Sequence, residues 1–222
     1  MVDLRKLFCG GYTSHPKTKW VSDSVPTAMN VVDHPDYDGK KVWLSDDEVE
    51  QLLDTPESSE RRIAFELAVR CGLRSAEVID VTADHVLETD AGDMLQVPEG
   101  KGDKYRETPL PKPLKRDINL MDEMADNDGE TVISVSTTQS LRNWIKDARE
   151  TLMEQTDDDR WRFVSMHDLR RTWATGLASS EVDPLIVCQW GGWSDLETFL
   201  DHYNGKYKPE AQKRERNKVD WL

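Results

Sequence analysis

The chain has 222 residues, of which 43 are acidic and 29 basic, so its formal net charge is −14. This length suits one full domain with a short extension. No stretch approaches the ~18 consecutive apolar residues that a membrane-spanning helix needs, and the N-terminus lacks the order of a signal peptide. We therefore expect a cytoplasmic protein with no membrane partner.

The acidic composition argues against a nucleic-acid partner, because affinity for DNA normally rests on lysine and arginine meeting phosphates. On composition alone, an acidic protein that does not bind nucleic acid is favoured. An acidic surface is also typical of proteins in a very salty cytoplasm, where charge attraction is screened within ~3 Å and binding depends on short-range contacts. The composition therefore leaves both alternatives open.

The cysteines Cys9, Cys71 and Cys188 lie far apart and are odd in number. This argues against a zinc site and against a disulfide framework. We expect small buried side chains or free thiols.

The first 41 residues are rich in Gly, Pro, Asp and Ser and show no sustained period, so 1–41 is predicted to be an arm or linker. At Ser45 the pattern changes. Ser45 and Glu48 form a capping box, which predicts the start of a helix. Its inward-facing residues would be Val49, Leu52 and Leu53. The rest of the chain, 42–222, is expected to form one domain.

Two further helices are predicted over 59–71, which Gly72 would end, and over 75–81. The segment 85–109 changes to brief apolar pieces separated by turn-rich stretches, which predicts a three-stranded antiparallel sheet. One or two helices are expected between Pro111 and the Asp-Asn-Asp-Gly stretch at 126–129.

Another helix is predicted over 138–155, where apolar residues recur at i, i+3 and i+4. These are Leu141, Trp144, Ile145, Ala148 and Leu152. Ser165 and the pair Asp183–Pro184 are caps of two more helices, and a capping box from Ser194 to Glu197 would open the helix that leads to Tyr203. The sum is a mainly α domain with one small antiparallel sheet, of the α+β class.

The segment from Ser165 to Thr175 carries the most informative chemistry. His167 and Arg170 are three residues apart, so on a helix they project from one face and reach one ligand. A guanidinium fork suits phosphate oxygens, and histidine exchanges a proton near neutral pH. The pair suits a phosphodiester, although such a pair taken alone is more often an accident on a surface helix.

Three further motifs accompany this pair in a fixed order. CGLRSAEV at Cys71–Val78 lies upstream, GKGDK at Gly100–Lys104 lies in the predicted sheet, and WGGWSDL at Trp190–Leu196 precedes Tyr203. Over 42–207, this ordered set resembles the tyrosine recombinase family, also called the phage integrase family. The resemblance implies the catalytic-domain fold of that family and an enzyme that breaks and rejoins double-stranded DNA through a 3′-phosphotyrosyl intermediate.

The resemblance also implies a role for each matching residue. Arg74 and Arg170 would hold the non-bridging oxygens of the scissile phosphate. Lys101, or Lys104 if the match is shifted, would protonate the leaving 5′ oxygen. His167 would hydrogen-bond the phosphate or take the proton of the tyrosine. No metal or other cofactor is implied.

Three more positions match the family pattern. Trp193 stands where most members carry a second histidine; its indole still donates one hydrogen bond and can pack the following helix, but it cannot shuttle protons. Glu77 matches an acidic position that would orient the active-site histidine or arginine. Tyr203 is the predicted nucleophile, and two nearby arginines would favour its phenolate.

Two features depart from the family pattern. Tyr203 follows Trp193 by ten residues, one more than usual, and one extra residue turns a helical side chain by about 100°. A kink or a longer entry loop must absorb it, and Tyr207 is the alternative nucleophile. The segment 1–41 has no counterpart of the helical domain that closes the DNA clamp in most members. We expect weak binding alone, a partner that supplies the clamp, or poor cutting.

Less specific explanations of the same residues also stay open. Arg74 and Glu77 could form a surface ion pair, Lys101 could be an ordinary turn residue, Trp193 could be core and Tyr203 could be a half-buried residue at a helix end. A non-catalytic DNA-binding regulator with this fold and a type IB topoisomerase-like enzyme are the alternative functions.

The sequence gives two further expectations about partners and source. We expect self-association on DNA, with the basic stretch 206–218 either docking on a neighbouring protomer or on DNA, or forming a solvated tail. The acidic composition predicts a source in a halophilic archaeon, or in one of its viruses or plasmids.

Overall fold

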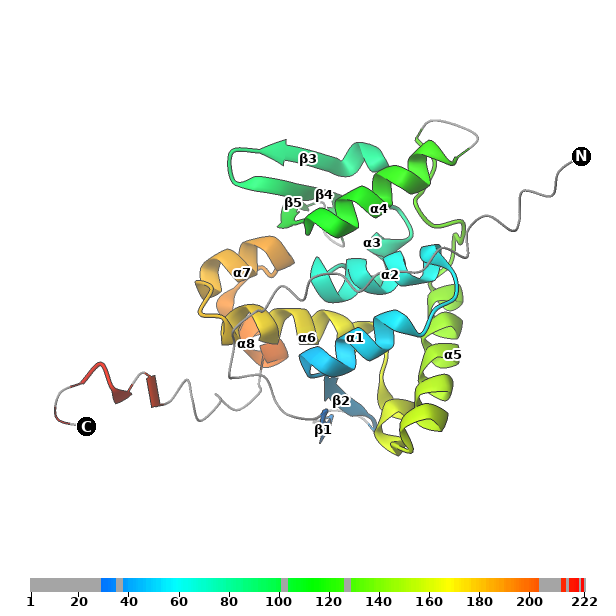
Figure 1. The fold of residues 1–222 in the computed structure, drawn as a ribbon. Helices are drawn as coiled ribbons and strands as arrows, with labels where there is room; N and C mark the ends of the chain where they lie inside the picture. Colours follow the sequence, from blue (N-terminus) through cyan, green and yellow to red (C-terminus); the bar gives the residue numbers. More distant parts are fainter. Residues whose placement is uncertain are drawn as a thin grey trace, which may run out of the picture.

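The computed structural model describes residues 29–34, 38–100, 104–125, 129–203, 213, 214, 216–219 and 221, but not the side chains at 98–100, 104 and 201–203. Helices make up most of this part, and two small antiparallel sheets lie at opposite ends of it (Figure 1). The predicted class, mainly α with a small three-stranded antiparallel sheet, is confirmed.

The first helix begins at the predicted capping box. In α1, Asp46–Asp54, the Ser45 hydroxyl accepts from the Glu48 amide, and the Glu48 carboxylate accepts from the Ser45 amide at 2.8 Å. These contacts satisfy two of the amides that a helix start leaves without partners. The three apolar residues predicted to face inward are buried.

The next two helices differ in how well their lengths were predicted. α2, Ser59–Arg70, ends just before Gly72, whose φ of +69° is a left-handed conformation that glycine adopts without strain. α3, Ser75–Val78, is shorter than the helix predicted over 75–81. The reason is that the Val81 carbonyl accepts from the Val132 amide at 2.8 Å, which draws the chain out of the helix.

The three-stranded sheet lies where the short apolar pieces predicted it. β3, Val86–Thr89, pairs with β4, Gly92–Gly100, and β4 pairs with β5, Lys104–Pro109, both antiparallel. Along β5, Arg106 and Thr108 face inward and are buried. A buried guanidinium needs hydrogen-bond acceptors inside the protein, so this strand directs a polar contact into the protein.

The remaining helical elements follow in chain order: η2 Ala83–His85, α4 Lys112–Glu123, α5 Thr138–Thr156, η3 Asp159–Phe163, α6 Met166–Ser179, α7 Pro184–Gly191 and α8 Leu196–Tyr203. A single helix, α4, occupies the place where one or two were expected. The predicted apolar face of α5 is buried as a whole.

Side-chain caps begin α6 and α7 as predicted. At α6, the Asp168 carboxylate accepts from the Ser165 amide at 3.0 Å and completes a capping box. At α7, the Asp183 carboxylate accepts from the Leu185 amide at 2.8 Å.

The predicted capping box at Ser194 is wrong. Asp195 is the residue whose carboxylate accepts from the Thr198 amide, at 2.7 Å, and the Ser194 hydroxyl instead donates to Asp195 at 2.9 Å. A carboxylate is the stronger acceptor for helix amides, so α8 begins one residue later than predicted.

A hairpin begins inside the segment predicted to be an arm and ends two residues beyond it. β1, Asn30–Asp33, pairs antiparallel with β2, Lys40–Trp43. Two amides at the end of this hairpin donate to side chains of α6: the Val42 amide to Asp168 at 3.0 Å and the Leu44 amide to Thr172 at 3.1 Å. Partners so distant in sequence leave no local pattern, which is why the hairpin was not predicted.

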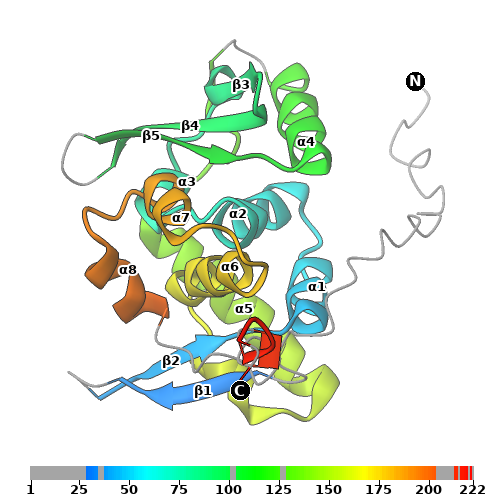
Figure 2. The same ribbon diagram turned by 90° about the vertical axis from the view of Figure 1, so that its left-hand side faces the viewer.

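Most of the helices form a layer between the two sheets, and α4 lies beside the three-stranded sheet (Figure 2). A main core fills this layer; among its fully buried members are Leu52, Phe65, Leu67, Ile118, Trp161 and Leu169. A second, smaller core joins α7 and α8 to α6 and consists of Trp173, Ala174, Val187, Cys188 and Phe199. The second core therefore sets the position of the last two helices.

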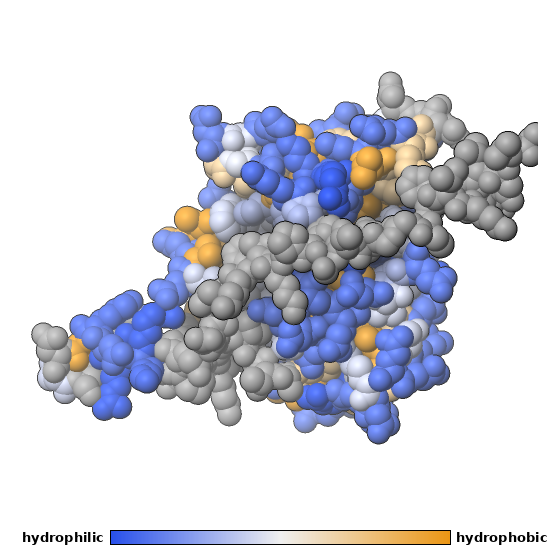
Figure 3. Space-filling view, viewed as in Figure 1, coloured by the Kyte–Doolittle hydropathy of each residue, from blue (hydrophilic) through white to orange (hydrophobic). Residues whose placement is uncertain are grey.

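The surface shown in Figure 3 is mostly hydrophilic, with apolar residues scattered over it. In the described part of the chain, no helix has the length and apolar character to cross a membrane. Cys71 and Cys188 are buried free thiols, as expected, and burial raises the pKa of Cys71. Cys9 lies outside the described residues.

Candidate active site

Arg170 lies in the first half of α6 and points into the protein, where it is 3% exposed. Its Nη1 donates to the carbonyl of Gly72, and its Nη2 donates to the carbonyl of Gly191 at 2.5 Å. The guanidinium also lies over the ring of Trp193, 4.4 Å from the centroid. Two carbonyls and a ring therefore fix the orientation of a planar group whose use for phosphate depends on orientation.

Arg74 is the N-cap residue of α3, and both its backbone and its side chain bind Glu77. Its Nη1 donates to Glu77 Oε1 at 2.7 Å, and its amide donates to Glu77 Oε2 at 2.6 Å. The Arg74 side chain is 36% exposed, but that of Glu77 is only 5% exposed. The carboxylate is thus buried while part of the guanidinium reaches solvent, where an anion can meet it.

Arg106 binds the same carboxylate from the other side. Its Nη1 and Nη2 donate to the two oxygens of Glu77, each at 2.8 Å, and its Nε donates to the carbonyl of Trp190 at 2.9 Å. Its side chain is 4% exposed. Glu77 therefore lies between two guanidinium groups, and Arg106 connects β5 to the C-terminal end of α7.

The charges of this cluster act on one another. Burial alone raises the pKa of Glu77, but the hydrogen bond and charge of Arg106, followed by Arg74, outweigh it and lower that pKa to about 2. Burial, then the charges of Arg74 and Arg106, lower the pKa of Arg170, and Glu77 offsets part of this effect. Arginine keeps its proton in proteins. The network therefore has three positive groups and one carboxylate, an excess that favours an anion.

Trp193 joins Arg170 to the last helix. Its ring stacks on Trp173 of α6, with centroids 6.0 Å apart and planes 18° apart, and meets Phe199 of α8 edge-on at 5.2 Å and 62°. A Cβ on Gly191 would lie 1.8 Å from this ring, so a glycine is required there. Trp193 thus packs the helix that follows it, one of the two roles that the resemblance implied.

The other predicted site residues are less completely described. His167 lies in the first turn of α6 and is exposed. Lys101 and Tyr207 lie outside the described residues; Lys104 begins β5 and Tyr203 ends α8, both without a described side chain. The structure brings together Arg74, Glu77, Arg170 and Trp193. The contacts of the lysines and tyrosines stay predictions.

Sequence reasoning missed Arg106, although a signal was present. The alternation along β5 puts Arg106 on the same side of the strand as the fully buried Thr108. A charged residue on the inward side of a strand calls for a buried partner. The nearest acidic candidate in the motifs was Glu77, which was assigned only to the histidine or an arginine of the active site.

Asp168, within the His-x-x-Arg motif, was also left without a role. It is 1% exposed. Its Oδ1 accepts from the Val42 amide at 3.0 Å and from Arg171 Nη1, while its Oδ2 accepts from the Ser165 amide at 3.0 Å. This buried carboxylate fixes the turn that carries the histidine and the arginine of the motif.

Three solved structures show what this fold is similar to. XerA recombinase matches with a TM-score of 0.64 and 18% identity over 79% of this chain and 64% of its own. The Tn1549 transposon integrase, in complex with transposon right end DNA, matches with a TM-score of 0.62 and 16% identity, over 83% of this chain and 67% of its own. The catalytic domain of bacteriophage HP1 integrase matches with a TM-score of 0.53 and 16% identity, over 77% of this chain and 90% of its own. At these identities the likeness concerns the fold alone.

The chain spans less than two thirds of the length of the XerA chain, and no curated protein matches its sequence. The model of the phage integrase family matches residues 42–210, which is most of the chain. The fold, the anchored arginine cluster and this match agree, and the chain belongs to the phage integrase family.

Proposed function

We propose that the chain is the catalytic part of a site-specific recombinase, which breaks and rejoins double-stranded DNA through a 3′-phosphotyrosyl intermediate. The joint anchoring of Arg74 and Arg170 is the observation that carries this proposal. Glu77 binds the guanidinium of Arg74, and two backbone carbonyls bind that of Arg170. Both guanidinium groups belong to one network with a net positive charge. Such a pair of oriented cations suits the oxygens of a phosphodiester and the charge of its transition state.

In the proposed reaction, the phenol oxygen of Tyr203 attacks phosphorus, and the bond from phosphorus to the 5′ oxygen breaks. His167 hydrogen-bonds the phosphate or takes the phenol proton, and Lys101 gives a proton to the leaving oxygen. Lys104 is the alternative donor. One phosphate ester replaces another, so the reverse reaction rejoins the strand without ATP.

The later start of α8 supports Tyr203 as the nucleophile. The ten-residue spacing from Trp193 required a longer entry into the helix. Two residues, Ser194 and Asp195, lie between Trp193 and the start of α8 at Leu196. A helix capped by Ser194 would have left only one residue there. The extra residue is therefore absorbed before the helix rather than within it.

We propose 1–41 as an arm and 42–222 as the catalytic domain. The chain covers 90% of the HP1 catalytic domain but 64% of the XerA chain. This difference supports 42–222 as a catalytic domain comparable to that of HP1 integrase. We also propose that a partner completes the clamp around the DNA. Double-stranded DNA is the proposed substrate, in line with the transposon DNA bound by the Tn1549 integrase.

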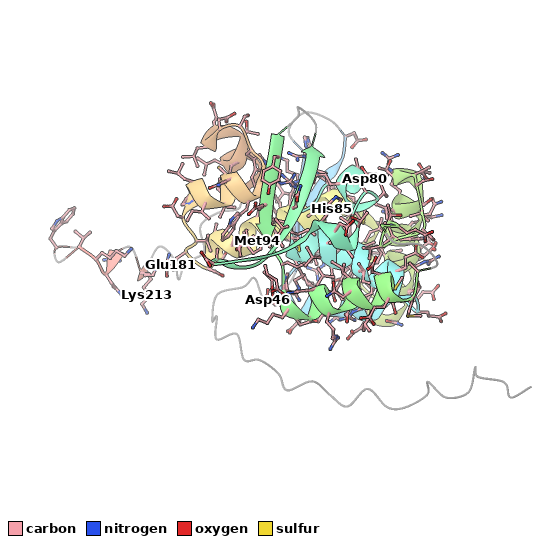
Figure 4. The ribbon with its side chains drawn as sticks, turned by 90° about the horizontal axis from the view of Figure 1, so that it is seen from above. Asp46, Asp80, His85, Met94, Glu181 and Lys213 are labelled. Carbon is pink, nitrogen blue, oxygen red and sulfur yellow. The ribbon has the colours of Figure 1, made fainter. Side chains whose placement is uncertain are left out.

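We propose self-association on DNA through the basic C-terminal stretch 206–218. Within its described part, Arg214 pairs with Glu181 at the end of α6 at 2.8 Å, and Figure 4 places Glu181 and Lys213 on one side of the molecule. Both partners of the pair are partly exposed, so the contact is weak. A weak contact within the chain is easily exchanged for one with a neighbour or with DNA.

We also propose that the protein works in a salty cytoplasm, as in a halophilic archaeon or one of its viruses or plasmids. The net charge of −14 supports this proposal, because an acidic protein binds DNA best where salt screens repulsion.

A nicked suicide substrate from the DNA next to the gene tests the proposed chemistry. The short 5′-hydroxyl fragment diffuses away after cleavage, so the phosphotyrosyl adduct accumulates. We expect the unmodified chain to form the adduct at high salt. Tyr203→Phe should bind DNA normally and form none, and Arg170→Ala should slow the reaction by at least about a hundredfold.

Each other outcome identifies a different function. An adduct with Tyr203→Phe but not with Tyr207→Phe would make Tyr207 the nucleophile. DNA binding with no adduct from the unmodified chain would favour the non-catalytic regulator. Relaxation of supercoiled plasmid without site preference would favour the type IB topoisomerase-like enzyme.

A further inference from the structure

We infer that Arg106 is a positioning residue for DNA cleavage. Its buried side chain binds the Glu77 carboxylate, which orients Arg74, and it also binds the turn that carries Trp193. This inference rests on the proposed recombinase function and goes beyond it, because Arg106 was not among the residues assigned a role from the sequence.

The first support is the geometry of the contact with Glu77. Two parallel hydrogen bonds of 2.8 Å join the guanidinium of Arg106 to both oxygens of the carboxylate. The same oxygens accept from the side chain and the amide of Arg74. A bidentate contact fixes the plane of the carboxylate. Arg106 therefore sets the direction in which Glu77 holds Arg74.

The second support comes from the end of α7. Arg106 Nε donates to the Trp190 carbonyl at 2.9 Å, and the next carbonyl, that of Gly191, accepts from Arg170. Two successive carbonyls thus bind two different arginines. Gly192 adopts a φ of +66°, and a Cβ there would lie 2.8 Å from Arg106 Cδ. The turn before Trp193 is therefore built around the Arg106 side chain.

The third support is the origin of Arg106 on β5. This strand begins at Lys104, three residues after the predicted general acid Lys101 in the sequence. Arg106 is 4% exposed and its described hydrogen bonds go to protein groups, so it holds the site together and does not itself contact DNA. β5, α3 and the α7–α8 turn therefore meet at this one side chain.

The electrostatic consequence can be measured through Glu77, whose charged neighbours are Arg74 and Arg106, with Arg170 close by. The pKa of Glu77 is lowered from 4.5 to about 2 with both arginines present, so the carboxylate stays ionised at pH values well below 4.5. Without Arg106, burial acts against Arg74 alone, and the pKa of Glu77 rises. The ionised form that orients Arg74 is then lost as the pH falls through the raised value.

The test measures adduct formation at saturating suicide substrate, together with DNA affinity, for the full chain and its variants. We expect Arg106→Met and Arg106→Lys to slow adduct formation at least tenfold while DNA affinity stays within twofold. Lysine keeps the charge but cannot make the bidentate contact. The rate of Arg106→Met relative to the unmodified chain should fall further as pH decreases, and Glu77→Gln in the same chain should remove that pH dependence.

Arg160→Met is the control, since Arg160 also binds a carboxylate through several hydrogen bonds and a backbone carbonyl, but lies in η3, which packs mainly on α5 and β2 rather than on β5, α3 or α7. It should cleave like the unmodified chain. Unchanged rates in both Arg106 variants, a loss confined to DNA affinity, an equal loss in Arg160→Met, or a pH dependence that persists with Glu77→Gln would overturn the inference. If Arg106→Met does not fold, Arg106→Lys decides alone, and a normal rate in it overturns the bidentate role. Absence of any adduct from the unmodified chain would instead refute the proposed function.

Discussion

The guanidinium carbon of Arg170 lies 4.4 Å from the centroid of the Trp193 ring, and Arg170 also donates to the carbonyl two residues before that tryptophan, at 2.5 Å. One short turn therefore provides both a ring and a carbonyl to the same guanidinium. The ring in turn touches Phe199 of α8, the helix that ends at Tyr203. The orientation of Arg170 and the placement of α8 thus depend on the same side chain.

Replacing Trp193 separates its packing from its hydrogen bond. Trp193→Phe keeps an aromatic face for Arg170 and for the second core, whereas Trp193→Ala removes both. We expect Trp193→Phe to form the covalent adduct within about threefold of the unmodified rate, and Trp193→Ala to lose at least about tenfold, which corresponds to about 1.4 kcal/mol. Equal losses in the two variants would show that the indole N–H, and not the packing, is what the reaction uses.

Substitution by alanine is expected to change the stability of the protein in opposite directions at two glycines, Gly191 and Gly176. A Cβ on Gly191 would lie 1.8 Å from the Trp193 ring, so Gly191→Ala should destabilise the protein by about 1–3 kcal/mol and slow cleavage. Gly176 lies in α6 with nothing within 4 Å of such a Cβ. Gly176→Ala should therefore stabilise the protein by about 0.5–1 kcal/mol. Urea unfolding measures both, and stabilisation by Gly191→Ala would contradict the close contact between ring and turn.

Sequence patterns predicted the structure best where the interacting residues lie close together along the chain. Caps such as Ser45 with Glu48 and the apolar stripe of α5 follow local rules, so these elements were predicted correctly. Arg74 and Arg170 were found through motif order. The contacts that hold them were not, because Arg106 and the carbonyl of Gly191 belong to segments that only the fold brings together.

Two local features were missed, for different reasons. The hairpin of β1 and β2 is fixed by Asp168, more than a hundred residues later, and leaves no periodic signal of its own. At the start of α8, Ser194 and Asp195 are both acceptable caps, and the local pattern did not decide between them.

The buried ion pair of Asp168 and Arg171 predicts how two substitutions combine in their effect on stability. Asp168→Asn should destabilise the protein by about 3–5 kcal/mol, because it leaves Arg171 buried without a countercharge. Asp168→Asn combined with Arg171→Met should recover part of that loss, since no unpaired charge remains. Urea unfolding of the single and double variants forms the cycle. Additive losses would mean that the pair is not coupled as the structure has it.

The C-terminal stretch is predicted to contribute to assembly on DNA. Removing residues 206–222 should lower the affinity for DNA or the size of the assembled complex, because positive charge clusters at 206–218 in an otherwise acidic chain. Glu181→Gln, which removes the partner of Arg214, is expected to release the stretch without deleting it and so to leave assembly intact or enhanced. Gel shift and light scattering report the two effects. A truncated chain with unchanged affinity and unchanged size would leave the stretch as a solvated tail.

Stability should depend on salt through the net charge of −14. Like charges repel over ~10 Å at 0.1 M salt but only over ~3 Å at 1 M, so we expect the melting temperature to fall on dialysis from molar to ~0.1 M KCl. Salt also strengthens apolar burial, and a charge variant separates the two effects. Asp122→Asn, Glu123→Gln and Glu154→Gln, made together, remove three exposed negative charges. The melting temperature of this variant should exceed that of the unmodified chain at low salt and be close to it at high salt. The reason is that the two proteins differ only in the repulsion between their negative charges. A melting temperature that does not change with KCl in either protein would remove the argument for a salty environment and restore the objection that the charge raises against DNA binding.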